Sequence, residues 1–157
     1  MKNIQYKFEY TRYESLEELD QERKDLVVAA QEIANQAYVP YSNFHVGAAV
    51  LLENGEILKG NNQENASYPV GICAERTLLS FVHANHPGKK MLKLAISVPD
   101  TDFDVSPCGM CRQFILEFEK KQAQPIEIIL HNRTGSVLVI PSTSVLLPLH
   151  FESKMLS

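Results

Sequence analysis

All three cysteines of this 157-residue chain fall in two short clusters, one of which also holds a glutamate. Cys73 is followed two positions later by Glu75. Cys108 and Cys111 belong to a Pro-Cys-Gly-Met-Cys segment. Three thiolates can hold a zinc ion and leave one coordination position open for an activated water, whose protons a nearby carboxylate can move. The pattern therefore indicates a catalytic zinc site with one Zn²⁺ per subunit.

Both cysteine clusters stand where helices are expected to begin. The free backbone N–H groups of a first helical turn donate to thiolate sulfur, and the helix dipole favours negative charge there. Cys108 and Cys111 are spaced i, i+3, so both sulfurs face the same side of one turn. Cys73 and Glu75 would diverge within a regular helix. Cys73 must therefore precede the first helical residue if both side chains are to meet one metal.

Two residues beside the first cysteine have both a catalytic and an ordinary interpretation. Three thiolates on Zn²⁺ leave one net negative charge, and Arg76 is a candidate to donate hydrogen bonds to the ligand sulfurs and offset it. The alternative is a plain surface arginine. Glu75 could likewise be present only because the helix dipole favours an acid in a first turn. The second cysteine cluster downstream favours the catalytic interpretation of Glu75.

A closed, structural zinc site and a redox pair are the competing interpretations of the cysteines. A closed site needs a fourth ligand, and His83 and His86 are the candidates. His83 lies ten residues beyond Cys73 on the same expected helix, which separates them by about 15 Å. A Cys-x-x-Cys redox pair would leave Cys73 and Glu75 unexplained.

Composition places the chain among ordinary globular proteins. It is 45% hydrophobic and 22% charged, and at this length one domain is expected, spanning 1–157 with an N-terminal extension at 1–24 and a core at 25–151. The longest apolar stretch, 46–52, is far below the roughly 20 residues of a membrane span. We therefore expect no membrane partner. Since the N-terminus lacks a secretion signal, we also expect a cytoplasmic protein with reduced thiols.

Charge favours a small substrate over a nucleic-acid polymer. The net charge is −4, and no basic stripe of the kind that grips a phosphate backbone is visible.

Periodicity predicts alternating helices and strands. Apolar residues recur at helical spacing over 14–37, and Pro40 is expected to end that helix. Asn54-Gly55 is a hairpin signal between two strands. The order predicts an α/β sandwich with one mixed sheet covered by helices. Further helices are expected at 74–83 and 111–121, and strands at 46–52, 56–59, 91–98, 126–130 and 137–140.

Four segments in this order carry a resemblance to a known family. The chain resembles the small, three-cysteine, homotetrameric zinc cytidine deaminases from about residue 34 to residue 151. The resemblance implies a three-layer α/β/α sandwich with a five-stranded mixed sheet, and a homotetramer with active sites shared between subunits. The segments are PYSNFHVGAA at 40–49, NQENASY at 62–68, CAERT at 73–77 and SPCGMCRQ at 106–113.

The resemblance also assigns roles to substrate-binding residues. Asn62 and Glu64 are implied to hold the ribose 3′-hydroxyl, and Phe44 to stack on the pyrimidine. The alternatives are a polar turn for the 60–68 loop and a plain core residue for Phe44. The resemblance further implies that the Ala74 backbone and Glu75 bind the base, that the Ser106 carbonyl meets the departing amine, and that neighbouring subunits contribute Tyr68 and Phe151.

The implied activity is zinc-dependent hydrolysis of cytidine and 2′-deoxycytidine to the uridines and ammonia, a pyrimidine-salvage reaction in which Glu75 carries each proton. One alternative is a relative that acts on a different aminopyrimidine or on cytosine in a polynucleotide. Another is a zinc-stabilised binding or assembly module without turnover.

Overall fold

The computed structural model describes residues 1–156. No helix in that range is long and apolar enough to cross a membrane. Helices and strands alternate along the chain much as the periodicity predicts. The strands are β1 (Thr11–Tyr13), β2 (Gly47–Leu52), β3 (Ile57–Asn61), β4 (Met91–Val98), β5 (Glu127–Asn132) and β6 (Val137–Ile140); the α-helices are α1 (Gln21–Ala34), α2 (Ala74–Asn85), α3 (Gly109–Gln122) and α4 (Thr143–Leu146); the 3₁₀ helices are η1 (Leu16–Glu18), η2 (Tyr68–Val70) and η3 (Ser153–Met155).

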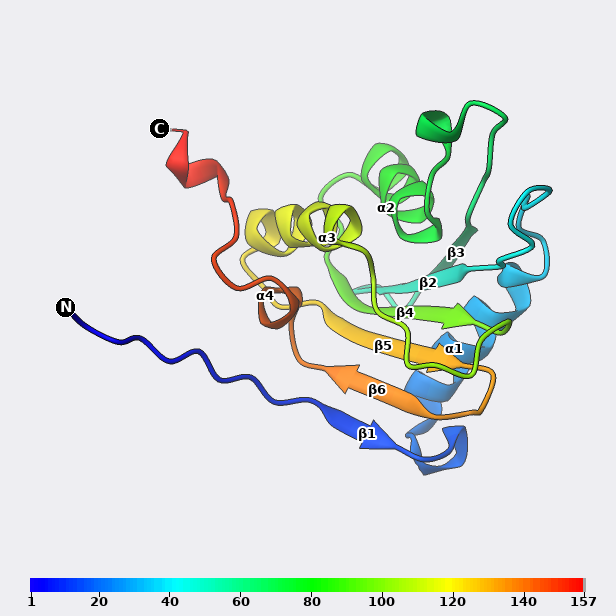
Figure 1. Cartoon of the computed structure of the whole chain (residues 1–157), viewed down its shortest axis with the longest axis horizontal. Coiled ribbons are helices and arrows are strands. Elements are labelled where there is room, and N and C mark those ends of the chain that lie inside the picture. Colours follow the sequence, from blue (N-terminus) through cyan, green and yellow to red (C-terminus); the bar gives the residue numbers. More distant parts are fainter. Residues whose placement is uncertain (157) are drawn as a thin grey trace.

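The described strands form one mixed sheet in the order β1-β6-β5-β4-β2-β3 (Figure 1). β4 and β5 run parallel, with Lys93 opposite Glu127, whereas the other neighbouring strands pair antiparallel. The sheet has six strands within residues 1–156, where five were expected. The additional strand is β1, which pairs with β6 at the edge of the sheet.

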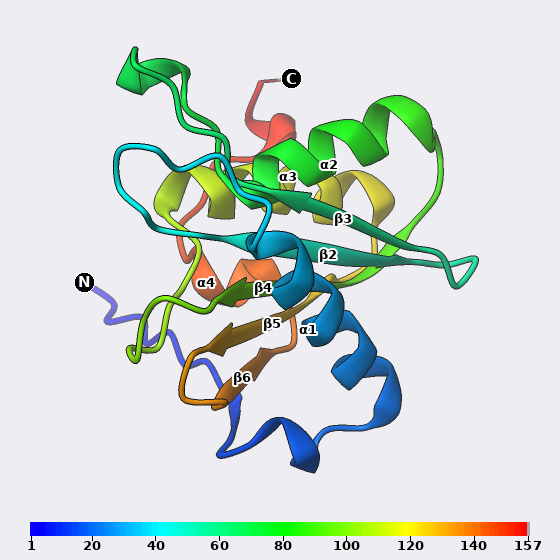
Figure 2. The same cartoon turned by 90° about the vertical axis from the view of Figure 1, so that its right-hand side faces the viewer.

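Helices cover both faces of the sheet, which confirms the three-layer sandwich (Figure 2). α2 and α3 pack on one face around Leu78, Ile96 and Ile115. α1 packs on the other face. Its approach is close, because a Cβ atom on Gly47 would lie 1.9 Å from the Ala30 carbonyl oxygen. Glycine is therefore required at the start of β2.

The first helix is shorter than the sequence predicted. Instead of one helix over 14–37, η1 is followed by α1 at Gln21–Ala34. Asp20 starts α1 because its side chain accepts a hydrogen bond from the Arg23 N–H at 2.9 Å. After Ala34, the Gln36 and Ala37 N–H groups bond back to carbonyls only three positions away, which closes the helix before Pro40.

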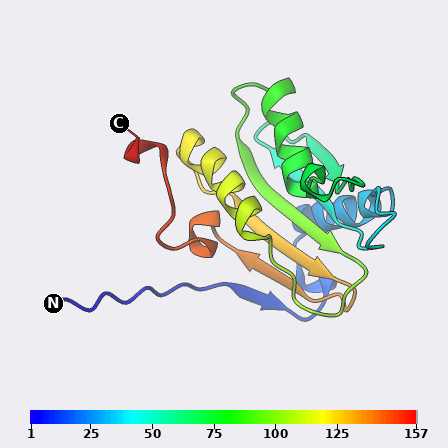
Figure 3. The same cartoon turned by 45° about the horizontal axis from the view of Figure 1, so that its top comes forward.

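The remaining elements lie close to their expected positions. β4 and β6 have the predicted limits, and the hairpin forms at Gly55 with φ of 83°. α2 and α3 extend a few residues further than expected. The N-terminal segment before β1 runs along the β6 side of the sheet and away from its body (Figure 3).

Candidate active site

Two helix N-termini bring the three cysteines together. Cys73 is the N-cap of α2 and Cys108 is the N-cap of α3, both in extended backbone conformation. Cys111 is buried in the first turn of α3. The three Sγ atoms lie within 4.8 Å of one another, and the cysteines form no disulfide. Cys73 thus precedes the helix, as the sulfur–carboxylate geometry requires.

The charges around the sulfurs suit a bound cation. The pKa of Cys73 is lowered to about 5, chiefly because the Cys111 thiol donates to its sulfur, and Arg76 adds to the effect. The same hydrogen bond raises the pKa of Cys111. An Arg76 Nη2 lies 4.0 Å from the Cys73 Sγ. Three clustered sulfurs beside one arginine fit a thiophilic divalent ion such as Zn²⁺.

Glu75 is buried in the first turn of α2, with 4% of its surface exposed. It stands outside the group of ligand atoms formed by the three cysteines. Burial raises the pKa of its carboxyl group, and hydrogen bonds from its own backbone and from Cys111 partly oppose that rise. A carboxylate beside the sulfurs but outside their group is free to move protons.

A cavity of about 280 Å³ opens over this group. Phe44 forms part of its wall and is 42% exposed, so it is not a plain core residue. Ile96 and Val98 of β4 and Val105 of the following loop add an aliphatic part of the wall. The lining residues are Phe44, Val46, Asn62, Cys73, Glu75, Ile96, Val98, Val105, Ser106, Pro107 and Cys108.

Asn62 links the cavity to the loop that carries Phe44. Its Oδ1 accepts from the Val46 N–H at 2.8 Å, and its Nδ2 donates to the Phe44 carbonyl at 2.9 Å. An asparagine amide has two acceptor sites and two N–H donors. One of each therefore remains for a ligand.

Glu64 and Tyr68 lie around a neighbouring hollow of about 270 Å³ and not in the cavity itself. The Glu64 carboxylate accepts from the Ser42 hydroxyl at 2.5 Å and from the Tyr41 N–H at 2.9 Å. These donors lower its pKa, the hydroxyl most. The exposed Tyr68 ring lies 5.9 Å from that of Tyr41.

The other predicted substrate-binding residues are more dispersed. Ala74 is fully buried between Cys73 and Glu75. Ser106 lines the cavity. Phe151 lies outside both hollows, and its side chain is exposed. Its backbone carbonyl accepts a hydrogen bond from the Gln113 side chain at 3.0 Å. Within this chain, Phe151 and the cavity are therefore not brought together.

Two polar residues that sequence reasoning missed, Arg112 and Asp100, hold the cavity walls. Arg112 donates to the Pro107 carbonyl at 2.7 Å and to the Ser106 Oγ at 3.0 Å. Asp100 accepts from the His45 N–H at 2.6 Å, beside Phe44. The sequence could have indicated Arg112, because it directly follows Cys111 in the expected helix and so lies near the site. The Asp100–His45 contact joins segments far apart in sequence, so no local pattern indicated it.

The two histidines considered as a fourth ligand lie elsewhere. The His83 ring is 5.2 Å from that of Phe118, and the His86 Nδ1 is 3.5 Å from Glu56. Neither belongs to the sulfur group. The site therefore has three sulfurs and an adjacent carboxylate, which defines the open metal site of a hydrolytic enzyme.

Comparisons with known proteins agree with this class. Residues 20–124 match the family described as the cytidine and deoxycytidylate deaminase zinc-binding region. A cytidine deaminase of Halalkalibacterium halodurans is 38% identical over 133 residues, which is 85% of this chain and 96% of that protein. One of Sporosarcina psychrophila is 48% identical over 93 residues, 59% of this chain and 67% of that protein.

Solved structures show the same likeness. The crystal structure of cytidine deaminase from Burkholderia pseudomallei superposes with a TM-score of 0.73 at 40% identity, and covers 81% of this chain and 97% of its own. The crystal structure of cytidine deaminase from Mycobacterium leprae superposes with a TM-score of 0.65 at 31% identity, and the match covers 82% of this chain and 99% of that chain. The chain belongs to the cytidine and deoxycytidylate deaminase family, whose cofactor is zinc.

Proposed function

We propose that this protein catalyses the hydrolytic deamination of cytidine and 2′-deoxycytidine, with release of ammonia, as a step of pyrimidine salvage. The observation that carries the proposal is the buried Glu75 beside three clustered sulfurs at a cavity of about 280 Å³. That volume is near the lower end of the roughly 300–1,000 Å³ of small-molecule sites, which suits a nucleoside better than a polymer. The relatives compared are named cytidine deaminases.

Cys73, Cys108 and Cys111 are proposed to hold the zinc ion. When bound, zinc would supply a Lewis acid that lowers the pKa of a water molecule. Arg76 would withdraw charge from the sulfurs through its contact with Cys73. The remaining chemistry falls to the protein's own groups.

Glu75 is proposed to carry both protons of the reaction. Its carboxylate accepts one from the attacking water and delivers it to N3 of the pyrimidine as the water oxygen bonds to C4. It then passes the second proton to the amino group, the C4–N bond breaks, and ammonia leaves. Water and cytidine are consumed, and uridine and ammonia are formed.

The walls of the cavity are proposed to orient the nucleoside. Phe44 would stack on the pyrimidine, since its ring is exposed to the cavity. Asn62 keeps one donor and one acceptor free for a ribose hydroxyl. Glu64 can accept one more hydrogen bond beyond those from Tyr41 and Ser42. The Ala74 backbone would bind the base, and the Ser106 carbonyl would meet the departing amine.

We also propose a homotetramer in which subunits complete each other's sites. Tyr68 and Phe151 are exposed aromatic residues outside the cavity, so they are available to a neighbouring subunit's site. The proposed location is the cytoplasm, where a reducing environment keeps the three thiols free to bind metal.

A spectrophotometric assay on purified protein tests the reaction and the cofactor together. We expect cytidine to lose its cytosine absorbance band, one zinc per chain to be present, and a chelator to abolish turnover. In competition, cytidine and deoxycytidine should react, and free cytosine and a short oligonucleotide should not. Bound zinc without turnover on any of these compounds would contradict the proposal.

A further inference from the structure

One wall of the cavity is a loop, residues 99–107, that joins β4 to the second cysteine cluster. Val105 and Ser106 of this loop line the cavity. Its first half is held by Asp100, which binds His45, and by Asp102, which binds Arg133 at 2.6 Å. Its last residues are held by Arg112. Between these two parts, the residue before Val105 makes a further contact.

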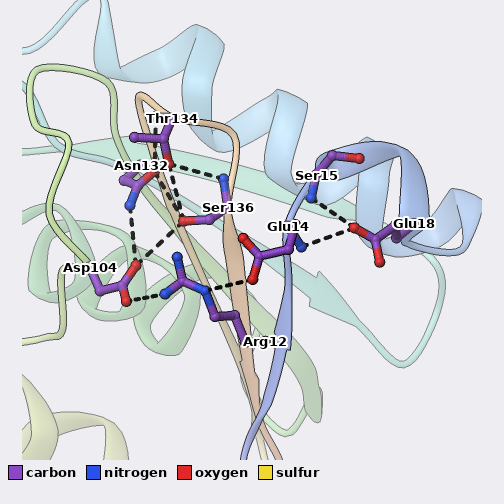
Figure 4. Close-up of polar contacts among 8 residues, drawn as sticks. All are labelled: Arg12, Glu14, Ser15, Glu18, Asp104, Asn132, Thr134 and Ser136. Atoms are coloured by element: carbon purple, nitrogen blue, oxygen red, sulfur yellow. Dashed lines mark hydrogen bonds and ion pairs between the residues drawn. The ribbon is translucent and has the colours of Figure 1, made fainter.

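That contact comes from the N-terminal strand. Arg12 of β1 forms an ion pair with Asp104, the residue that precedes Val105 (Figure 4). The other Asp104 oxygen lies 3.3 Å from the Asn132 Nδ2 and 3.4 Å from the Ser136 Oγ. Asn132 is buried, and it also donates to the Phe103 carbonyl at 3.1 Å. Asp104 is thus fixed between β1 and the turn that joins β5 and β6.

Arg12 is itself held in place before it meets the loop. β1 pairs Arg12 with Leu138 of β6, and the neighbouring Tyr13 packs on the α1 face of the sheet. Since side chains alternate along a strand, Arg12 points to the opposite face. Its Nε donates to Glu14 at 3.1 Å. The ion pair therefore joins the edge strand of the sheet to the loop.

The segment before β1 lies behind the same wall. Phe8 and Tyr10 line a small cavity of about 120 Å³ together with Val105 and Ser106. These two loop residues thus face the N-terminal segment on one side and the substrate cavity on the other. Residues 1–19 lie outside the stretch that matches the family.

We propose that the N-terminal strand positions the active-site wall, with Arg12 as a positioning residue that fixes Val105 and Ser106 through Asp104. The proposal rests on the proposed function, because it assigns these residues to the nucleoside site. Arg12 does not reach the cavity itself. Its effect should be on substrate binding, since a loosened wall weakens contacts made in both the ground state and the transition state.

The test compares Arg12→Met, Arg12→Lys and Asp104→Asn in the full chain. Methionine keeps the apolar stem of arginine and removes its charge. Lys24→Gln is the matched control, because Lys24 forms an ion pair with Glu17 at 2.7 Å, also near the N-terminus but away from the loop. The readouts are kcat and KM for cytidine, zinc content, and hydrogen exchange of the 103–106 amides.

We expect Arg12→Met and Asp104→Asn each to raise KM about 3- to 5-fold, the range set by an exposed ion pair, with kcat and zinc content little changed. The double variant Arg12→Met/Asp104→Asn should have the same KM as either single variant, because each change removes the same ion pair. Arg12→Lys should recover most of the wild-type KM. The 103–106 amides should exchange faster in Arg12→Met and at the wild-type rate in Lys24→Gln.

Ionic strength gives an independent readout. Cytidine is uncharged, whereas the Arg12–Asp104 pair is exposed and therefore screened by salt. Salt should raise the wild-type KM toward that of Arg12→Met and leave the variant unaffected.

A wild-type KM in folded Arg12→Met would overturn the proposal, as would a fall in kcat alone or no recovery in Arg12→Lys. Absence of turnover in the wild-type protein would instead reject the proposed function. In that case unchanged amide exchange in Arg12→Met would reject the positioning role, and faster exchange would support it.

Discussion

Two glutamates in this protein have similarly small exposed surfaces and opposite pKa shifts. Glu75 is 4% exposed in the first turn of α2, and Glu119 is 5% exposed near the end of α3. Burial dominates at Glu75 and raises its pKa. At Glu119, burial also acts to raise the pKa, but hydrogen-bond donors outweigh it and the net pKa is lowered.

Several hydrogen-bond donors surround the Glu119 carboxylate and outweigh the effect of its burial. Its carboxylate accepts from the Thr143 N–H at 2.9 Å, the Ile126 N–H at 3.0 Å and the Ser142 and Ser144 hydroxyls, each at 2.6 Å. These groups tie α3 to the residue before β5 and to the N-cap and first turn of α4. A buried carboxylate whose lone pairs are filled is structural. One with few donors remains free to exchange protons.

The largest expected effect is on turnover at Glu75. Glu75→Gln should lower kcat by at least about 10³-fold, equivalent to about 4 kcal/mol of transition-state stabilisation, because an amide cannot accept and return a proton. Zinc content and the thermal midpoint should not fall, since the neutral amide costs less to bury. Steady-state kinetics and calorimetry check this. Residual activity within tenfold of wild type would contradict the role of Glu75.

The matched change at Glu119 should affect stability instead. Glu119→Gln places an NH₂ group against N–H and hydroxyl donors, which should cost about 1–3 kcal/mol for each unsatisfied group. The thermal midpoint should fall by about 2–4 °C per kcal/mol. Turnover at 25 °C should stay near wild type. If Glu119→Gln abolished activity in a folded protein, the contrast between the two glutamates would fail.

The lowered pKa of Glu119 predicts an acid dependence of stability. In the unfolded chain its carboxyl group has a pKa of about 4.3, and in the folded protein the pKa is lower. The folded state therefore gains stability that is complete above the unfolded pKa and is lost as the pH falls through the folded pKa. Urea unfolding from pH 7 to pH 3 should show a steeper loss for wild type than for Glu119→Gln. Parallel curves would show that Glu119 does not contribute this dependence.

The smallest expected effect concerns one donor of the network. Ser144→Ala removes a single hydroxyl from Glu119 and leaves Ser142 and three backbone N–H groups in place. We expect a loss of about 1 kcal/mol in unfolding free energy, measured by urea denaturation. Ser80→Ala, on the exposed face of α2, is the control for a serine-to-alanine change in a helix. A loss as large as that of Glu119→Gln would mean that the donors do not share the carboxylate as described.

Local sequence predicted the chemistry at helix starts better than the contacts between distant segments. Cys73, Glu75, Cys108 and Cys111 could be placed because cap and first-turn positions follow from short patterns. Glu119 could not be assigned, since its partners lie at 126 and at 142–144 and a glutamate late in a helix is usually solvated.

The N-terminal region shows the same limit. β1 has only three residues, and its pairing with β6 is non-local, so the helical spacing of Leu16 and Leu19 dominated the prediction there. The alternating Tyr6, Phe8 and Tyr10 were a period-two signal for extended chain that could have indicated it. At the cavity, the resemblance grouped Asn62 with Glu64, whereas within the single chain they line adjacent hollows.

The parallel pairing of β4 and β5 determines where a site could arise in this chain. Antiparallel neighbours can be joined by a two-residue turn, but parallel ones need a long crossover that leaves the sheet at the carboxyl end of one strand and returns to the opposite end. That crossover consists of residues 99–126, which include α3, so it supplies Val105, Ser106 and the second cysteine cluster. The cavity therefore lies at the carboxyl end of β4, where the parallel pairing requires the chain to leave the sheet.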